Sequence, residues 1–104
     1  MAENRLEILK NLVAQDPNNS FARYGRAMAY ATAGNHAEAV EEHRKLLEVN
    51  PKYAAAYYHQ GQSLEKLGRV DEAREIYRRG IDITAQTGDE HTRGELQAVL
   101  DLLG

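Results

Sequence analysis

Two copies of one sequence pattern stand 34 residues apart in this chain. The turn Asp16-Pro17 returns as Asn50-Pro51, and identical residues recur at the same offset. The recurring pairs are Ala22 and Ala56, Tyr24 and Tyr58, Gly34 and Gly68, Glu38 and Glu72, Ala39 and Ala73, and Arg44 and Arg78. A period of this length is typical of helix–turn–helix repeats that stack on one another. The chain is therefore expected to be all-α.

Apolar residues at helical spacing locate the individual helices. Leu6, Leu9 and Val13 predict a first helix. It ends before Asp16-Pro17, because proline disfavours helical geometry in the residue before it. Further helices are predicted over residues 20–33, 35–49, 53–67, 70–85 and 88–104. The sequence contains no strand pattern, so the prediction is about six helices joined by short turns.

Capping signals mark several of the predicted helix ends. Gly34 supplies the left-handed turn that closes a helix. Asn35 with Glu38, and Thr87 with Glu90, resemble capping boxes, in which two side chains satisfy free amides at the start of a helix. These signals support short turns between antiparallel helices.

The repeated residues resemble those of the tetratricopeptide repeat family, whose pattern is W-x2-L-G-x2-Y, then A-x3-F, then P. In the second copy the matching residues are Tyr57, Gln60, Gly61, Leu64, Ala73 and Tyr77, with Ala85 in place of the proline. In the first copy they are Arg23, Arg26, Ala27, Tyr30, Ala39, His43 and Pro51. The resemblance implies a short α-solenoid of antiparallel helix pairs.

The resemblance also implies how the single domain, residues 1–104, is divided. Residues 1–17 form a half-repeat helix, 20–53 the first repeat, 54–87 the second repeat and 88–104 a C-terminal capping helix. Arg23, Arg26 and Gln60 depart from the pattern, since they replace large apolar residues. Either that end of the first repeat is less buried, or these side chains line a surface. Gly80 predicts a tight helix crossing, because a glycine inside a helix is otherwise unfavourable.

In this family the first helix of each pair lines a concave groove that holds a peptide or a partner helix. By resemblance, the candidate groove residues are Phe21, Tyr24, Met28 and Ala31, followed by Ala55, Tyr58, Gln62 and Glu65. Lys66 and Arg93 are added as candidates for polar contact with a partner. The function implied is a non-catalytic module that binds a protein or peptide partner.

Three alternatives to the open groove remain. Phe21, Tyr24 and Met28 are also consistent with a core that a terminal helix covers. Assembly into a homodimer through the terminal helices is a second possibility, with Leu6, Ile8, Leu12 and Leu102 as its candidate residues. A clamp for a partner's C-terminal carboxylate is disfavoured, because the side chains near the expected donor positions are of the wrong type.

Charge pairs cover the predicted helix surfaces. Arg69, Arg74, Arg78 and Arg79 form a basic run. Glu75 precedes Arg79 by four residues, which is the favourable order for an ion pair on a helix. The run is interpreted as a solvated face, with contact to an acidic partner as the alternative.

Composition excludes several other classes of function. The net charge of −3 argues against nucleic-acid binding, which needs a basic surface. There are no cysteines, and the four histidines lack the spacing of metal ligands. We therefore expect no metal, no cofactor and no catalytic residues. The polar N-terminus and the lack of a long apolar run predict no membrane segment, and the chain is expected to be complete and cytoplasmic.

Overall fold

The computed structural model describes residues 2–104, with side chains from residue 5 onward. Within this part of the chain there are six α-helices and no strands, which confirms the predicted all-α class. The helices are α1 (Ala2–Gln15), α2 (Ser20–Thr32), α3 (His36–Val49), α4 (Ala54–Lys66), α5 (Val70–Thr87) and α6 (Glu90–Leu103).

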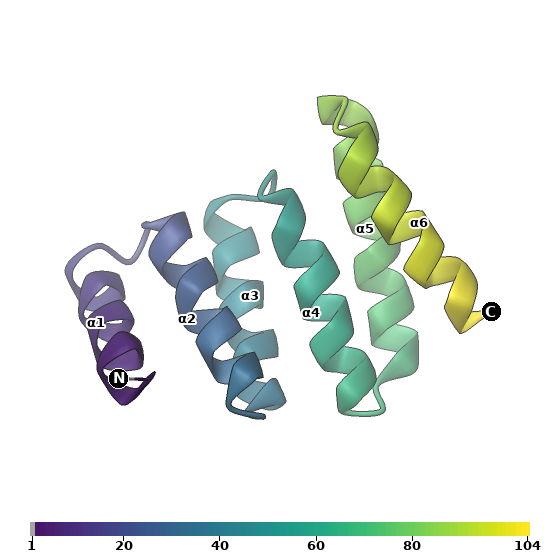
Figure 1. Ribbon diagram of the computed structural model, residues 1–104. Helices are drawn as coiled ribbons and strands as arrows, with labels where there is room; N and C mark the ends of the chain where they lie inside the picture. Colours follow the sequence, from purple (N-terminus) through teal and green to yellow (C-terminus); the bar gives the residue numbers. More distant parts are fainter. Residues whose placement is uncertain (1) are drawn as a thin grey trace.

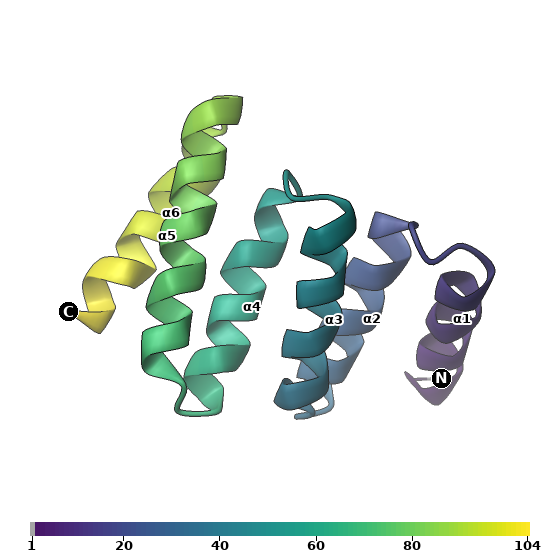
Figure 2. The same ribbon diagram turned by 180° about the vertical axis from the view of Figure 1, so that it is seen from behind.

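Consecutive helices run antiparallel and stack side by side (Figure 1). Helices α2, α4 and α6 form one layer, and α3 and α5 form the layer behind it (Figures 1 and 2). Each helix packs mainly on its neighbours in sequence, while α4 also contacts α2 and α6 across the front layer. The result is a short solenoid measuring 38 × 28 × 20 Å.

The turns after α2 and α4 have the same geometry. Gly34 has a φ of +83° and Gly68 a φ of +76°, values that favour glycine. The amide of Asn35 donates to the carbonyl of Tyr30 at 2.8 Å, and the amide of Arg69 donates to the carbonyl of Leu64 at 2.9 Å. This six-to-one bond is the mark of a Schellman motif. The repeated glycines of the sequence therefore close equivalent helices in the same way.

The predicted capping boxes are wrong in both places. Asn35 forms no side-chain hydrogen bond to the start of α3. Thr87 is the last residue of α5, and Gly88, where φ is +78°, is the C-cap of that helix. The side chain that caps α6 is that of Asp89, which accepts a hydrogen bond from the amide of Thr92 at 3.1 Å. Both errors have one cause: the motif was matched by spacing, while the backbone turn decides where each helix begins.

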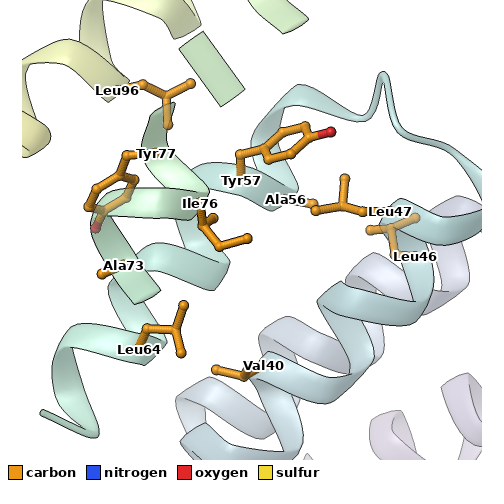
Figure 3. Close-up of a cluster of buried hydrophobic side chains, with 10 residues drawn as sticks. All are labelled: Val40, Leu46, Leu47, Ala56, Tyr57, Leu64, Ala73, Ile76, Tyr77 and Leu96. Carbon is orange, nitrogen blue, oxygen red and sulfur yellow. The ribbon is translucent and has the colours of Figure 1, made fainter. Parts of the chain in front are cut away.

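The core lies chiefly in the second repeat, between α4 and α5 (Figure 3). Two glycines there each receive the tyrosine of the facing helix. A Cβ on Gly61 would lie 2.1 Å from Tyr77 Cε1, and a Cβ on Gly80 would lie 2.6 Å from Tyr57 Cβ. These distances confirm the tight crossing that Gly80 predicts, because no larger residue fits at either position without a shift.

Candidate partner-binding site

We call the six candidate residues that lie on α2 and α4 the α2–α4 face: Phe21, Tyr24, Met28, Tyr58, Gln62 and Lys66. Phe21 stands at the start of α2 and is 76% exposed. Tyr24, Met28 and Tyr58 are half-buried. Covering by a terminal helix is wrong for Phe21, because neither α1 nor α6 removes its ring from solvent.

Five aromatic rings join α2, α3 and α4, and two of them, those of Tyr24 and Tyr58, belong to this face. We call Tyr24, His43, Tyr53, Tyr58 and His59 the aromatic cluster. The ring centroid of Tyr24 lies 5.1 Å from that of Tyr53, 5.8 Å from that of His59 and 5.9 Å from that of His43. Tyr58 meets His59 edge-on at 5.2 Å. The repeated tyrosine pair is therefore linked through His59, which the sequence analysis had not chosen as a site residue.

Burial keeps the histidines of the aromatic cluster neutral. His43 is fully buried, and neither ring nitrogen has a hydrogen-bond partner among the described residues. Burial, together with repulsion from His59, lowers the pKa of His43 to about 3. Burial also lowers the pKa of His59, although Glu95 opposes that shift. The cluster therefore contributes ring surface rather than charge near neutral pH.

Gln62 has a structural partner as well as a surface position. Its amide donates to the Tyr77 hydroxyl at 2.7 Å, and that hydroxyl donates in turn to the Glu65 carboxylate. Burial and then this carboxylate raise the pKa of Tyr77 above its usual range. Lys66 follows at the end of α4, where its side chain is exposed. The face is thus aromatic along α2 and becomes polar toward the end of α4.

Arg93 lies apart from the other six candidate residues. It donates to Glu90 on its own helix and lines a shallow depression with Gln97 and Asp101. Helix α6 begins 36 residues after α4 rather than 34, so the 34-residue repeat does not continue unchanged into α6. A role for Arg93 in partner contact stays a prediction.

A buried carboxylate explains two of the departures from the repeat pattern. Glu42 is 4% exposed, and Arg23 Nη1 lies 2.7 Å from its Oε1. Arg26 Nε lies 3.6 Å from Glu42 Oε2. The arginines replace apolar residues because they neutralise this charge, so the first repeat is held by ions where the second is apolar. Sequence reasoning missed Glu42, and the signal was the pair of cations at apolar positions.

Two further expectations concern metals and membranes. Across the described residues, no group of three or more His, Cys, Asp or Glu side chains could hold a metal ion. None of the helices in this part of the chain is both long and apolar enough to cross a membrane. The cytoplasmic location stays a prediction.

Comparison with known proteins identifies the family. Two models described as tetratricopeptide repeat match the chain, one over residues 31–92 and one over residues 6–45. The chain belongs to the tetratricopeptide repeat family. This confirms the resemblance read from the sequence, while the boundaries between repeats stay predictions.

Similar proteins cover nearly the whole chain. The TPR repeat-containing protein PA0015 of Pseudomonas aeruginosa is 27% identical over 95 residues, which are 91% of this chain and 90% of that protein. The solution structure of a tetratricopeptide repeat domain protein from Salinibacter ruber is 32% identical, with a TM-score of 0.79, and covers 85% of this chain and 89% of its own. The TPR2B domain of yeast Sti1, solved in a complex with pHsp70, has a TM-score of 0.91 at 17% identity, covering 98% of this chain and 82% of its own.

Proposed function

We propose that this protein is a non-catalytic module that binds a segment of a partner protein across the α2–α4 face. The observation that carries the proposal is the exposure of Phe21, beside Tyr24 on the same helix. A large aromatic ring gains little for folding when it remains in water, whereas aromatic rings are enriched at protein interfaces. The Phe21 ring lies on α2, which α1 and α3 hold in place.

The family supports the same kind of function. Tetratricopeptide repeats form a generally non-catalytic interaction fold, and the Sti1 domain of nearly the same shape was solved with a protein partner. The partner segment proposed here is apolar along α2 and polar where it passes Gln62 and Lys66. A C-terminal carboxylate clamp is not proposed, because Tyr24, Met28 and Gln62 stand near the positions of its cationic donors.

Substitution of Phe21 tests the proposal with least disturbance of the fold. Phe21→Ala is expected to weaken partner binding at least about tenfold, because aromatic anchors at an interface are often worth more than 1.4 kcal/mol. Leu102→Ala is the matched control, since Leu102 is 86% exposed but lies on α6. Equal loss of binding in both variants would contradict the assignment of the α2–α4 face.

Self-association is a second candidate function, and the exposure of apolar residues on both terminal helices favours it. Ile8 and Leu12 are exposed on α1, as is Leu102 on α6, while Leu6 is half-buried. Light scattering over a concentration series distinguishes the two functions. A protein that remains monomeric at high concentration would exclude a homodimer and leave the α2–α4 proposal standing.

A further inference from the structure

The two ends of the solenoid present different surfaces to water. Helices α1 and α6 lie at opposite ends of the stack (Figure 1). The outer face of α6 is polar, since Arg93 donates to Glu90 and the Gln97 amide donates to Asp101 at 2.9 Å. Of the described side chains of α6, Leu102 is the one that is large, apolar and exposed. This is the surface expected of a helix that ends a repeat array in water.

Helix α1 has a wider apolar face than its one neighbour covers. Among the described helices it packs on α2 alone. Leu9 and Val13 are buried there, and a Cβ on Gly25 of α2 would lie 3.0 Å from Leu9 Cδ2. Ile8 and Leu12, one helical turn apart, remain 58% and 40% exposed. The outer side of α1 therefore lacks the polar cover that α6 has.

Charged residues flank these two apolar side chains. We call Arg5, Ile8, Leu12 and Asp16 the α1 stripe. Their spacings of three, four and four residues place them along one side of the helix. The Asp16 amide donates to the Leu12 carbonyl at 3.0 Å, so the last helical turn reaches Asp16. Neither Arg5 nor Asp16 forms an ion pair within the described residues. The stripe thus runs from positive through apolar to negative.

We propose that the α1 stripes of two copies of this chain pack antiparallel and form a homodimer. Ile8 of one copy meets Leu12 of the other, and Arg5 of each copy meets Asp16 of the other. A two-fold axis produces both pairs from a single surface and closes the assembly at two copies. This inference rests on the self-association proposed above, which it narrows to one end of the solenoid. It does not involve the α2–α4 face.

The order of charges selects this arrangement. In a parallel pair Arg5 would face Arg5 and Asp16 would face Asp16, and like charges across an interface are unfavourable. Head-to-tail contact between α1 and α6 would instead place the apolar stripe against a polar surface whose groups are already paired. The α1 stripe is short, and small interfaces are weak, so the Kd of the dimer is expected to be on the order of 10 μM to 1 mM.

Sedimentation equilibrium of the full chain over a concentration series measures this Kd. Ile8→Gln is expected to raise the Kd at least about tenfold, because each dimer loses two buried aliphatic side chains. Leu102→Gln is the matched control, since it makes a similar change on an exposed residue at the other end of the solenoid. Its Kd is expected to equal that of the wild type.

Charge exchange tests the antiparallel arrangement. Arg5→Glu is expected to raise the Kd about fivefold, because Glu would then face Asp16 at both ends of the interface. Adding Asp16→Arg to the same chain reverses the whole stripe and is expected to restore the wild-type Kd. Lys10→Glu is the control for net charge, since Lys10 pairs with Glu7 and lies off the stripe. Circular dichroism checks that each variant is folded.

Three results would overturn the inference. They are a wild-type chain that stays monomeric at about 1 mM, a Leu102→Gln chain that dimerises as weakly as Ile8→Gln, and a double variant that stays as weak as Arg5→Glu. The first also excludes self-association as a function, whereas the other two leave it standing with a different interface. Partner binding by the α2–α4 face is measured separately with the Phe21 variant and is decided by none of them.

Discussion

The two repeats share a backbone but differ in what holds them together. In the second repeat, α4 and α5 cross closely because Gly61 receives Tyr77 and Gly80 receives Tyr57. The first repeat has Ala27, His43, Leu46 and Arg23 at the corresponding positions. There α2 and α3 meet through the ion pairs of Glu42 and the neutral imidazole ring of His43. The comparison shows that one helical geometry accepts an apolar crossing in one repeat and a polar one in the next.

The difference coincides with the division of function that we propose. The second repeat supplies six of the ten residues of the main buried apolar cluster. The first repeat carries Phe21, the exposed ring of the α2–α4 face. Repeat proteins allow such a division, because each repeat contacts only its neighbours and its residues can change with local effect.

The largest expected effect comes from adding one methyl group to the apolar crossing. Gly61→Ala places a Cβ inside the Tyr77 ring contact and is expected to lower the free energy of unfolding by about 3 kcal/mol. Urea denaturation measures this change. Ala27→Gly, the reverse exchange in the first repeat, is the control and is expected to cost about 1 kcal/mol. A fully stable Gly61→Ala protein would show that the two crossings are equivalent.

The second-largest loss of stability is expected from disrupting the buried ion pairs of the first repeat. Glu42→Gln leaves Arg23 and Arg26 partly buried without a balancing charge, and is expected to cost about 2–3 kcal/mol in urea denaturation. The exposed Glu38 serves for comparison, since Glu38→Gln is expected to change stability by less than about 0.5 kcal/mol. Similar values for the two variants would mean that Glu42 is not a structural charge.

Acid should act on the first repeat through His43. Its pKa is lowered to about 3 in the folded protein, so below pH 6.5 the unfolded chain binds a proton that the folded chain does not. Stability therefore falls as the pH falls, by about 2 kcal/mol between pH 6.5 and pH 5. Urea denaturation across this range measures the slope. His43→Phe is expected to reduce it, and an unchanged slope would assign the titration to other groups.

Substitution of Gln60 should raise the stability of the protein rather than lower it. Gln60→Leu removes a buried oxygen without a partner and is expected to raise the free energy of unfolding by about 1 kcal/mol. Thermal unfolding of the two proteins checks this. A less stable Gln60→Leu protein would mean that the amide supports the fold.

The fold was largely predictable because its strongest determinants are local. Gly34 and Gly68 recur at one offset, and both close a helix through the same hydrogen bonds. The tight crossing at Gly80 was predictable for a similar reason, since a glycine within a helix calls for an explanation in packing. The residue type alone predicts the local structure at these glycines.

The site was less predictable because its features depend on partners distant in sequence. Glu42 looks like any acid on a helix surface until Arg23 and Arg26 are placed beside it. Arg79 has Glu75 four residues before it, which predicts an ion pair, yet its guanidinium lies over the Tyr57 ring. In each case tertiary packing prevailed over a local pattern.

Phe21 is expected to have the smallest effect on stability. Phe21→Ala should change the free energy of unfolding by less than about 0.5 kcal/mol, because the ring is already in water. Urea denaturation beside the wild-type chain tests this. A loss above about 1 kcal/mol would show that the ring belongs to the core of the first repeat.

The most direct test of the account measures the partner affinity of that same variant. A partner is first recovered with the tagged full chain, and its Kd is then determined by calorimetry for the wild type, Phe21→Ala and Leu102→Ala. The account predicts a Kd at least about tenfold weaker for Phe21→Ala and an unchanged Kd for Leu102→Ala. A folded Phe21→Ala protein that binds the partner as tightly as the wild type would contradict it.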